Sequence, residues 1–490
     1  MNNVAPSTPV LVGVGIVAQR EQDPACAREA VALMSDALMA AGHDCGVAAL
    51  PAQAQAIYVP QGLWSYQNPA GMIAEAVGAS AARSVLGKIG ITQQALIDQA
   101  CRSIAEGDVE VAVVAGGEAR YRALRASING VEAAETESGS LPDEAMEPEA
   151  ELYHESEVAA LGHMPVGYYA IIESAIRAHH GRGMEQHRDE LARLYSEFSA
   201  VAAANPYAWK RQRLTPEDIR NPSAKNPMLA YPYTKLHNTS WNVDQASALL
   251  LCSAAKAAAL GIPRERWVFP LASAGSNRML SLAQRPDLAR LPGARLAGEA
   301  LLQHTGVALE AIDLVELYSC FPAAVELYAE EFGLALTRPL TVTGGMPFAG
   351  GPLNNFVLQS TCRMAQLLRE PSSVNGLVSA VTGLMTKQAF ALWSSEAPAT
   401  PFEVLDVSAE TAAECPPREV VADYVGRGRV VGYTVLYASG ERQRAVALLD
   451  LPGGQRTLAV CDDPESMALM EQREHVGVTV AVAHGAFTLQ

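Results

Sequence analysis

The stretch ELYSCF, residues 316–321, ends a predicted strand with two side chains that can take part in chemistry. The phenol of Tyr318 can donate or accept a proton, and the thiol of Cys320 becomes a nucleophile once it ionises. Open α/β sheets place their active sites at the ends of strands. The same pattern is also typical of a Tyr and a Cys packed where two domains meet. The pattern alone leaves both interpretations open.

A glycine-rich stretch follows, LTVTGGMPFAGGPLNNF at residues 340–356. Gly344, Gly345, Gly350 and Gly351 allow positive φ angles or a close approach of the backbone to another group. Loops of this kind often surround a ligand. This one contains no His, Cys, Ser, Asp, Glu or Lys, so it has the form of a site without a reactive side chain.

Three further patterns are interpreted as structural. A GxGxxA pattern at residues 13–18 imitates a dinucleotide-binding loop, but no helix opens directly after it and no acidic strand end follows. His179, His180 and His187 are separated by a Gly-Arg-Gly break, so no metal site is expected there. The eight Cys residues include no CxxC pair, which favours a reduced, cytoplasmic protein without zinc or disulfides.

Length and charge restrict the function classes. A chain of 490 residues is too long for one core, so several domains are expected. The net charge of −17 argues against a general nucleic-acid binder and against binding to an anionic membrane surface. The first residues, MNNVAPSTPV, do not resemble a signal peptide, and no apolar run is long enough for membrane insertion.

Apolar periodicity predicts an α/β order that occurs twice. The first copy comprises strands at 9–16 and 56–60, a helix at 25–42, and a helix, turn and strand within 91–119. The second copy comprises strands within 311–320, 376–383 and 389–395 and a helix within 350–368. Between the copies, an acidic stretch (131–157), helices and a basic, Pro-rich stretch indicate an inserted unit. After a linker at 396–403, short strands with Gly turns predict a small β-barrel.

The order of five stretches resembles the thiolase superfamily: GDVEVAVVAGGEA, HNTSWNVDQASALLL, ELYSCFPAAVELYAEEFGL, GGMPFAGGPL and VSAVTGLMTK. Within it, the chain is most similar to thiolase-like protein type 1 of the sterol-carrier-protein branch. This resemblance implies an α/β fold with two βαβαβαββ halves layered as αβαβα, a mostly helical inserted loop domain and a C-terminal all-β OB-like domain. The implied domains are 1–119 (completed by about 240–262), a CoA-binding insertion at 120–239, 263–396 and 405–490.

The resemblance also implies which catalytic groups are missing. The nucleophilic Cys of thiolases falls on Gly90, and the His of their Gly-His-Pro motif falls on Gly351. The second Cys, an acid/base, falls on Val381 or Thr382. The Asn-Glu-x-Phe or His-Asp-x-Phe motif becomes the stretch at 318–321, which begins with Tyr318 and includes Cys320. Without a thiolate beside a base, ordinary thiolase turnover is expected to be slower by many orders of magnitude.

The ligand-binding side of a thiolase is expected to remain. Ser240 falls on the residue that contacts pantetheine, although Trp241 replaces a glycine beside it. Lys and Arg residues make the insertion basic, which suits phosphates; ordinary surface cations are the other interpretation. No tightly bound cofactor is expected, with coenzyme A or acyl-CoA as the ligand. The residues predicted to bind it are Ser240, Asn238, Lys235, Lys225, Arg213, Arg211 and Gly350, with Lys210 in the same basic stretch.

Two classes of function follow from the resemblance. The first is a protein of lipid metabolism that binds CoA thioesters or another lipid-like acyl ligand, an acetyl-CoA acetyltransferase by descent without ordinary thiolase activity. The second is an enzyme, either a Tyr-dependent retro-aldol C–C lyase acting on a β-hydroxyacyl-CoA or an acyltransferase working with a partner subunit. Thiolase-fold aldolases carry Tyr-Asp-x-Phe, which residues 318–321 match at Tyr318 and Phe321 only. A monomer or homodimer is expected, with no nucleic-acid partner.

Overall fold

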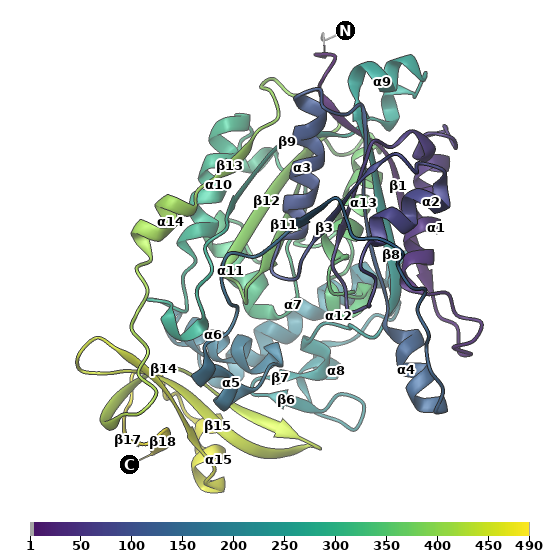
Figure 1. The fold of residues 1–490 in the computed structure, drawn as a ribbon. Helices are drawn as coiled ribbons and strands as arrows, with labels where there is room; N and C mark the ends of the chain where they lie inside the picture. Colours follow the sequence, from purple (N-terminus) through teal and green to yellow (C-terminus); the bar gives the residue numbers. More distant parts are fainter. Residues whose placement is uncertain (1–3, 490) are drawn as a thin grey trace.

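The computed structural model describes residues 4–489, and its first half is built on a six-stranded mixed sheet (Figure 1). The strand order is β1-β8-β4-β2-β3-β5. β2, β3 and β4 run parallel, whereas β8 runs antiparallel between β1 and β4. The strands are β1 (Pro9–Gln19), β2 (Ala56–Pro60), β3 (Arg83–Gly87), β4 (Val111–Ala119), β5 (Glu144–Met146) and β8 (Asp244–Ser253).

A second sheet repeats this arrangement with the order β10-β11-β12-β9-β13. Here β10 runs parallel to β11, and β12 runs antiparallel between β11 and β9, as β8 does between β4 and β1. The strands are β9 (Phe269–Ser276), β10 (Leu314–Glu316), β11 (Asn375–Thr382), β12 (Lys387–Ser394) and β13 (Val404–Asp406). The predicted duplication of an α/β unit is therefore confirmed.

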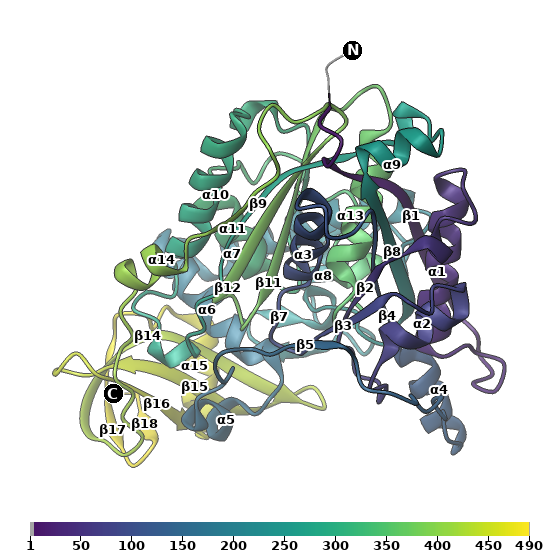
Figure 2. The same ribbon diagram turned by 45° about the horizontal axis from the view of Figure 1, so that its top comes forward.

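Helices form three layers around the two sheets (Figure 2). α3 (Gln93–Ala105) and α13 (Phe356–Leu368) contact strands of both sheets and form the central layer, where their apolar faces are buried. On the outer face of the first sheet lie α1 (Ala30–Asp44) and α2 (Pro69–Val77). On that of the second sheet lie α10 (Pro292–Thr305) and α11 (Pro322–Phe332). This order confirms the predicted αβαβα layers.

The segment between β4 and β8 is mostly helical, but its first part returns to the first sheet. β5 pairs in parallel with β3 and so covers the outer edge of that strand. The other elements of the segment are α4 (Arg120–Asn129), α5 (Glu155–Leu161), α6 (Pro165–His179), α7 (Met184–Ala204), α8 (Pro216–Arg220), β6 (Met228–Ala230) and β7 (Tyr233–Thr234). The domain boundaries read from the sequence stay predictions.

The C-terminal strands form a barrel-like sheet that continues into the insertion. Its order is β15-β16-β18-β17-β14-β6-β7, and a further β14–β15 pairing closes the five C-terminal strands on themselves. β14 also contacts β6, where Tyr231 donates its backbone N–H to the Val435 carbonyl oxygen at 2.9 Å. The elements are β14 (Val425–Ala438), β15 (Glu441–Asp450), β16 (Arg456–Cys461), α15 (Pro464–Gln472), β17 (Thr479–Ala483) and β18 (Ala486–Thr488).

The remaining helices are short connections. They are α9 (Ala254–Ala259), α12 (Met346–Ala349), α14 (Ser408–Glu414) and the 3-10 turns η1 (Pro51–Gln53), η2 (Lys235–His237), η3 (Arg264–Arg266), η4 (Leu282–Gln284) and η5 (Leu309–Ala311). Within residues 4–489, every helix is too short or too polar to cross a membrane.

Candidate functional site

The residues that follow β10 are fixed by contacts from three other elements. Tyr318 donates its backbone N–H to the Ser379 hydroxyl oxygen of β11 at 2.8 Å. The Ser319 carbonyl oxygen accepts a hydrogen bond from the Tyr195 hydroxyl of α7 at 3.2 Å. The Ser319 hydroxyl oxygen accepts one from the Met346 N–H of α12 at 3.1 Å. These bonds hold Tyr318 between the second sheet and the insertion, as the strand-end argument predicts.

Tyr318 and Cys320 lie close together but in an apolar environment. They are only 7% and 8% exposed, and the Tyr318 ring packs edge-on against Phe356. Burial, followed by the nearby Cys320, raises the pKa of Tyr318 far above its usual value. Burial also raises the pKa of Cys320 to about 12, although the Tyr169 hydroxyl beside it favours the thiolate. At neutral pH, Cys320 is a thiol, and Tyr318 can donate a proton but cannot act as a base.

The glycine-rich loop is tightly packed. Gly344, Gly345 and Gly350 have φ angles of +99°, +75° and +100°, which other residues rarely adopt. A Cβ atom on Gly344 would lie 2.4 Å from the backbone of Ala202 in α7. The buried carboxylate of Glu316 accepts hydrogen bonds from the N–H groups and hydroxyls at the start of this loop. The glycines are therefore needed for close packing as well as for turns.

Gly351, the predicted counterpart of the thiolase His, is closely surrounded by neighbouring side chains. A Cβ atom on Gly351 would lie 2.3 Å from Thr239 Cγ2 and 3.0 Å from Met346 Cε. The Gly351 N–H also donates to the Ser240 carbonyl oxygen at 2.9 Å, which holds the two segments together. Beside it, a Cβ on Gly350 would lie 2.1 Å from Gln245 Oε1. The missing side chain has left no space behind.

Gly90, the predicted counterpart of the thiolase nucleophile, is surrounded in a similar way. Gly90 has a φ angle of +103°, and a Cβ there would lie 2.9 Å from Pro148 Cβ. The Lys387 ammonium nitrogen, Nζ, donates to the Gly90 carbonyl oxygen at 3.1 Å. Lys387 is fully buried at the start of β12, and this burial lowers its pKa. Sequence reasoning missed Lys387; the signal was a lone lysine leading into an apolar strand.

The predicted position of the second thiolase Cys, Val381 or Thr382, lies at the end of β11. Val381 lies in β11 and is 8% exposed, and Thr382 pairs with Lys387 across the hairpin. Leu384 and Met385, in the turn after β11, adopt positive φ angles of 51° and 76°. No acid or base of the usual thiolase set therefore stands at this place.

The residues predicted to bind a ligand are accessible, except Gly350, which is buried. Ser240 and Asn238 are half-buried, and their side chains donate to the Pro347 and Thr234 carbonyl oxygens at 2.8 and 2.7 Å. The four predicted cations are exposed and make no ion pair among residues 4–489. They are Lys225, Lys235, Arg211 and Arg213.

Two of the basic residues in the insertion form a cluster with a cation from the first sheet. Burial lowers the pKa of Lys210 to about 8, assisted by the positive charges of Lys235 and Arg20. The backbone N–H of Lys210 donates to the Phe348 carbonyl oxygen of α12 at 2.8 Å. The Arg20 guanidinium lies over the Trp209 ring, 4.5 Å from its centroid. Sequence reasoning missed Arg20, because it lies almost 190 positions from Lys210 in the chain.

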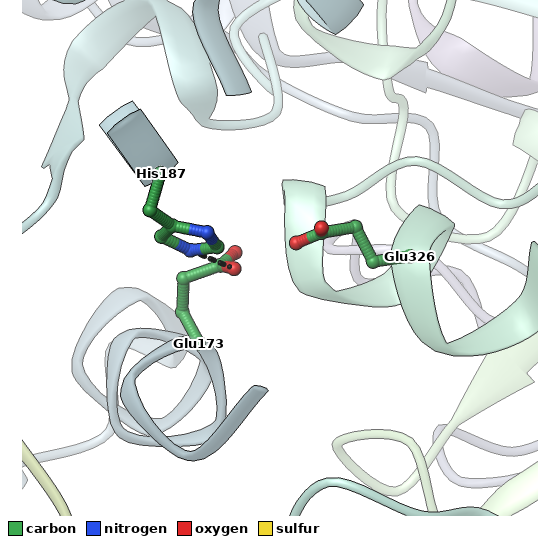
Figure 3. A group of neighbouring side chains, drawn as sticks. All are labelled: Glu173, His187 and Glu326. Carbon is green, nitrogen blue, oxygen red and sulfur yellow. Dashed lines mark hydrogen bonds and ion pairs between the residues drawn. The ribbon is translucent and has the colours of Figure 1, made fainter. Parts of the chain in front are cut away.

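A second buried group joins Glu173 of α6, His187 of α7 and Glu326 of α11 (Figure 3). His187 Nε2 lies 2.7 Å from Glu173 Oε1, and one ligand atom of each residue lies within 4.8 Å of the others. His179 and His180 are not part of the group and face Glu330 instead. The three residue types are ones that bind metals, a possibility that the sequence did not suggest.

Arg182 determines how this group is bonded. Its guanidinium donates a hydrogen bond to Glu326 Oε1 and lies 3.3 Å from His187 Nδ1. Because a guanidinium only donates, Nδ1 must accept, and Nε2 then carries the hydrogen that points at Glu173. A metal would need the lone pair of Nε2 and would place a second positive charge beside Arg182. The residues therefore fit a hydrogen-bonded network, which we call the Glu173–His187–Glu326 network, better than a metal site.

The repeated strand order, the two helices between the sheets and the glycine loop at Gly350 define a protein of the thiolase class. No family model matches the chain. A search of solved structures finds a monomeric SCP2-thiolase like protein type 1 from Mycobacterium smegmatis, 27% identical, with a TM-score of 0.82 over 100% of both chains. The chain is thus a thiolase-like protein, and the predicted relationship is confirmed.

Two more distant structures share the fold. The Ltp2-ChsH2(DUF35) aldolase is 18% identical, with a TM-score of 0.59 over 80% of this chain and 100% of that chain. An acetyl-CoA acetyltransferase from Syntrophomonas wolfei is 18% identical, with a TM-score of 0.55 over the same shares. At this identity they support the architecture and not an activity.

Proposed function

We propose that this protein binds coenzyme A or its acyl thioesters and does not perform the ordinary thiolase reaction. The observation that carries the proposal is the cluster of Lys210, Lys235 and Arg20 beside α12. Lys235 and Arg20 lie close enough to Lys210 to help lower its pKa, and none of the three cations has a carboxylate partner among residues 4–489. Such a cluster fits an anionic ligand. Phosphate groups supply that charge.

Aromatic side chains next to the cations suit the adenine ring. Trp209 packs against Tyr121, with ring centroids 5.4 Å apart. Trp241 is 42% exposed, and the Arg120 guanidinium lies 5.4 Å from its ring centroid. A ring system and a basic cluster in neighbouring segments match the two ends of a nucleotide. Ser240, next to Trp241, would then lie along the path of the pantetheine chain.

Loss of thiolase chemistry rests on the filled positions at Gly90 and Gly351. A thioester exchange through an acyl-cysteine needs a thiolate and a base near one carbonyl carbon. Pro148 and Lys387 stand beside Gly90, and Thr239 and Met346 stand beside Gly351. An acyltransferase reaction would therefore depend on a partner subunit that brings its own nucleophile.

Calorimetry with CoA, acetyl-CoA and a long-chain acyl-CoA tests the proposal. We expect a dissociation constant below about 1 mM. A Lys210→Ala/Lys235→Ala double variant should weaken binding by about tenfold or more, since charge-assisted hydrogen bonds are lost. Lys256→Ala is the matched control, because Lys256 lies on α9 and pairs with Glu110 at 3.5 Å. Absence of binding, or equal weakening by the control, would contradict the proposal.

A retro-aldol activity is the second candidate, and it rests on Tyr318. Its hydroxyl makes no hydrogen bond to another residue in the described part of the chain, and its high pKa keeps it protonated. That state suits a hydrogen-bond donor to the thioester oxygen of the substrate, whereas the proton of the β-hydroxyl would have to go to a separate base. The test is Tyr318→Phe with a β-hydroxyacyl-CoA. Cleavage that survives within a few-fold in the variant would exclude this role, whereas loss of cleavage with unchanged CoA affinity would support it.

A further inference from the structure

A cleft of about 470 Å³ lies beside the free edge of the second sheet, between the end of α7, β10 and α13. Its volume is in the range of sites for small molecules. Its walls are mainly apolar, and they include none of the residues discussed above as catalytic or CoA-binding. The main apolar contributors are Val201, Leu314, Val315, Pro339, Val342 and Leu367.

The cleft exists because the two halves of the fold differ at this point. In the first sheet, β3 and β5 continue the sheet beyond β2. In the second sheet, β10 is the last strand among residues 4–489. Just after β10, the Leu317 N–H donates one backbone hydrogen bond to the Leu340 carbonyl oxygen. α7 faces this edge with the small side chains of Ala200 and Ala204, which do not fill the space.

Most polar side chains of the cleft already have partners. The Asn205 amide donates to the Thr343 carbonyl oxygen, and the Thr341 hydroxyl donates to Glu316. The Asp313 carboxylate accepts the backbone N–H groups of two residues before and at the start of β11.

Arg363 is the exception. It forms no ion pair among the described residues, its Nε is buried without a partner, and one of its terminal nitrogens donates to Gln366 at 3.2 Å. Arg363 and Asp313 are the two charged side chains of the cleft, and Asp313 is already bonded to backbone N–H groups, whereas Arg363 pairs with no carboxylate among the described residues. An apolar cleft with one unpaired cation fits a molecule with an apolar chain and one negative end.

We propose that this cleft binds an aliphatic monocarboxylate of the fatty-acid type, with its chain along β10 and its carboxylate on Arg363. The inference is independent of CoA binding, because the cleft does not include α12, Lys210 or Lys235. A guanidinium can take a carboxylate with two parallel hydrogen bonds, and the walls replace water around the methylene groups.

Titration calorimetry with saturated fatty acids of increasing length, each below its micelle concentration, tests the proposal. Affinity should rise about fourfold per added methylene until the cleft is full and then level off. Arg363→Gln should weaken carboxylate binding about tenfold or more, and should leave the matching fatty alcohol unaffected. Arg193→Gln, on an exposed part of α7, is the charge-matched control and should change neither.

A second variant, Ala200→Phe, fills the cleft without changing its charge, and circular dichroism checks that it folds. It should abolish binding of the longer acids and of the alcohol while CoA binding stays as in the unmodified protein. Affinity that does not depend on chain length, or that neither variant alters, would overturn the proposal. So would selective binding of an extended peptide along β10 in place of the fatty acids.

Discussion

Replacing Glu326 by Gln should stabilise the protein at pH 8 and remove part of the pH dependence of its stability. Glu326 lies between Glu173 and Arg182 and is 4% exposed. Burial, and then the neighbouring carboxylate of Glu173, raise its pKa to about 8, against the opposing effect of Arg182. At neutral pH it therefore keeps its proton and shares it with Glu173, whose own pKa is also raised by burial.

The sign follows from proton binding in the two states. Between pH 4.5 and 8, the unfolded chain has lost this proton and the folded protein has not, so stability falls as the pH rises. At about 1.36 kcal/mol per tenfold change in proton affinity, the loss over this window is on the order of 5 kcal/mol. A glutamine amide can donate to Glu173 and accept from Arg182, so it imitates the protonated acid at every pH.

Urea unfolding at pH 5, 6, 7 and 8 measures this effect as the difference between Glu326→Gln and the unmodified protein. His187, whose pKa burial lowers to about 4, contributes with the opposite sign below pH 6.5, and its pKa also depends on Glu326. The decisive comparison is therefore the one between pH 7 and pH 8, where His187 is largely neutral in the folded and the unfolded chain. Glu75→Gln is the control, since it changes an exposed acid of α2 that forms no ion pair among the described residues. Parallel curves for Glu326→Gln and the unmodified protein would refute a proton-sharing pair, as would a variant that is less stable at pH 8.

Three other changes test the filled positions and the covered sheet edge. Gly351→His should lower the free energy of unfolding by about 2 kcal/mol or more, because Thr239 Cγ2 would lie 2.3 Å from the new Cβ. The variant should restore no thiolysis of acetoacetyl-CoA. Thermal unfolding should show that Thr239→Ala partly restores its stability. Lys387→Met should stabilise the protein against urea at pH 7, and by less at pH 9.5. The reason is that the buried amine has a lowered pKa in the folded protein, so the unmodified protein gains stability as the pH rises. Equal effects at both pH values would argue against this. Ala145→Pro should uncover the edge of β3 and promote association, which light scattering would show as a larger mass than that of the unmodified protein.

The sequence by itself determined the class of fold, and it predicts that the usual catalytic set is absent. Strands, helices and Gly turns follow local periodicity, and their repetition along the chain indicated two similar halves. The identities of Gly90, Gly351 and Val381 are also local information, so the missing Cys and His residues could be recognised without a structure. Tyr318 was placed correctly at a strand end for the same reason.

Only the tertiary structure decided what occupies the vacated positions. Pro148 and Lys387 reach Gly90, and Thr239 reaches Gly351, from segments far away in the chain. The same holds for Arg20 beside Lys210 and for Glu326 beside Glu173. Such contacts depend on how the two sheets and the insertion pack together. Local propensity carries no information about them, so steric filling, charge clustering and shifted pKa values became visible only in the folded chain.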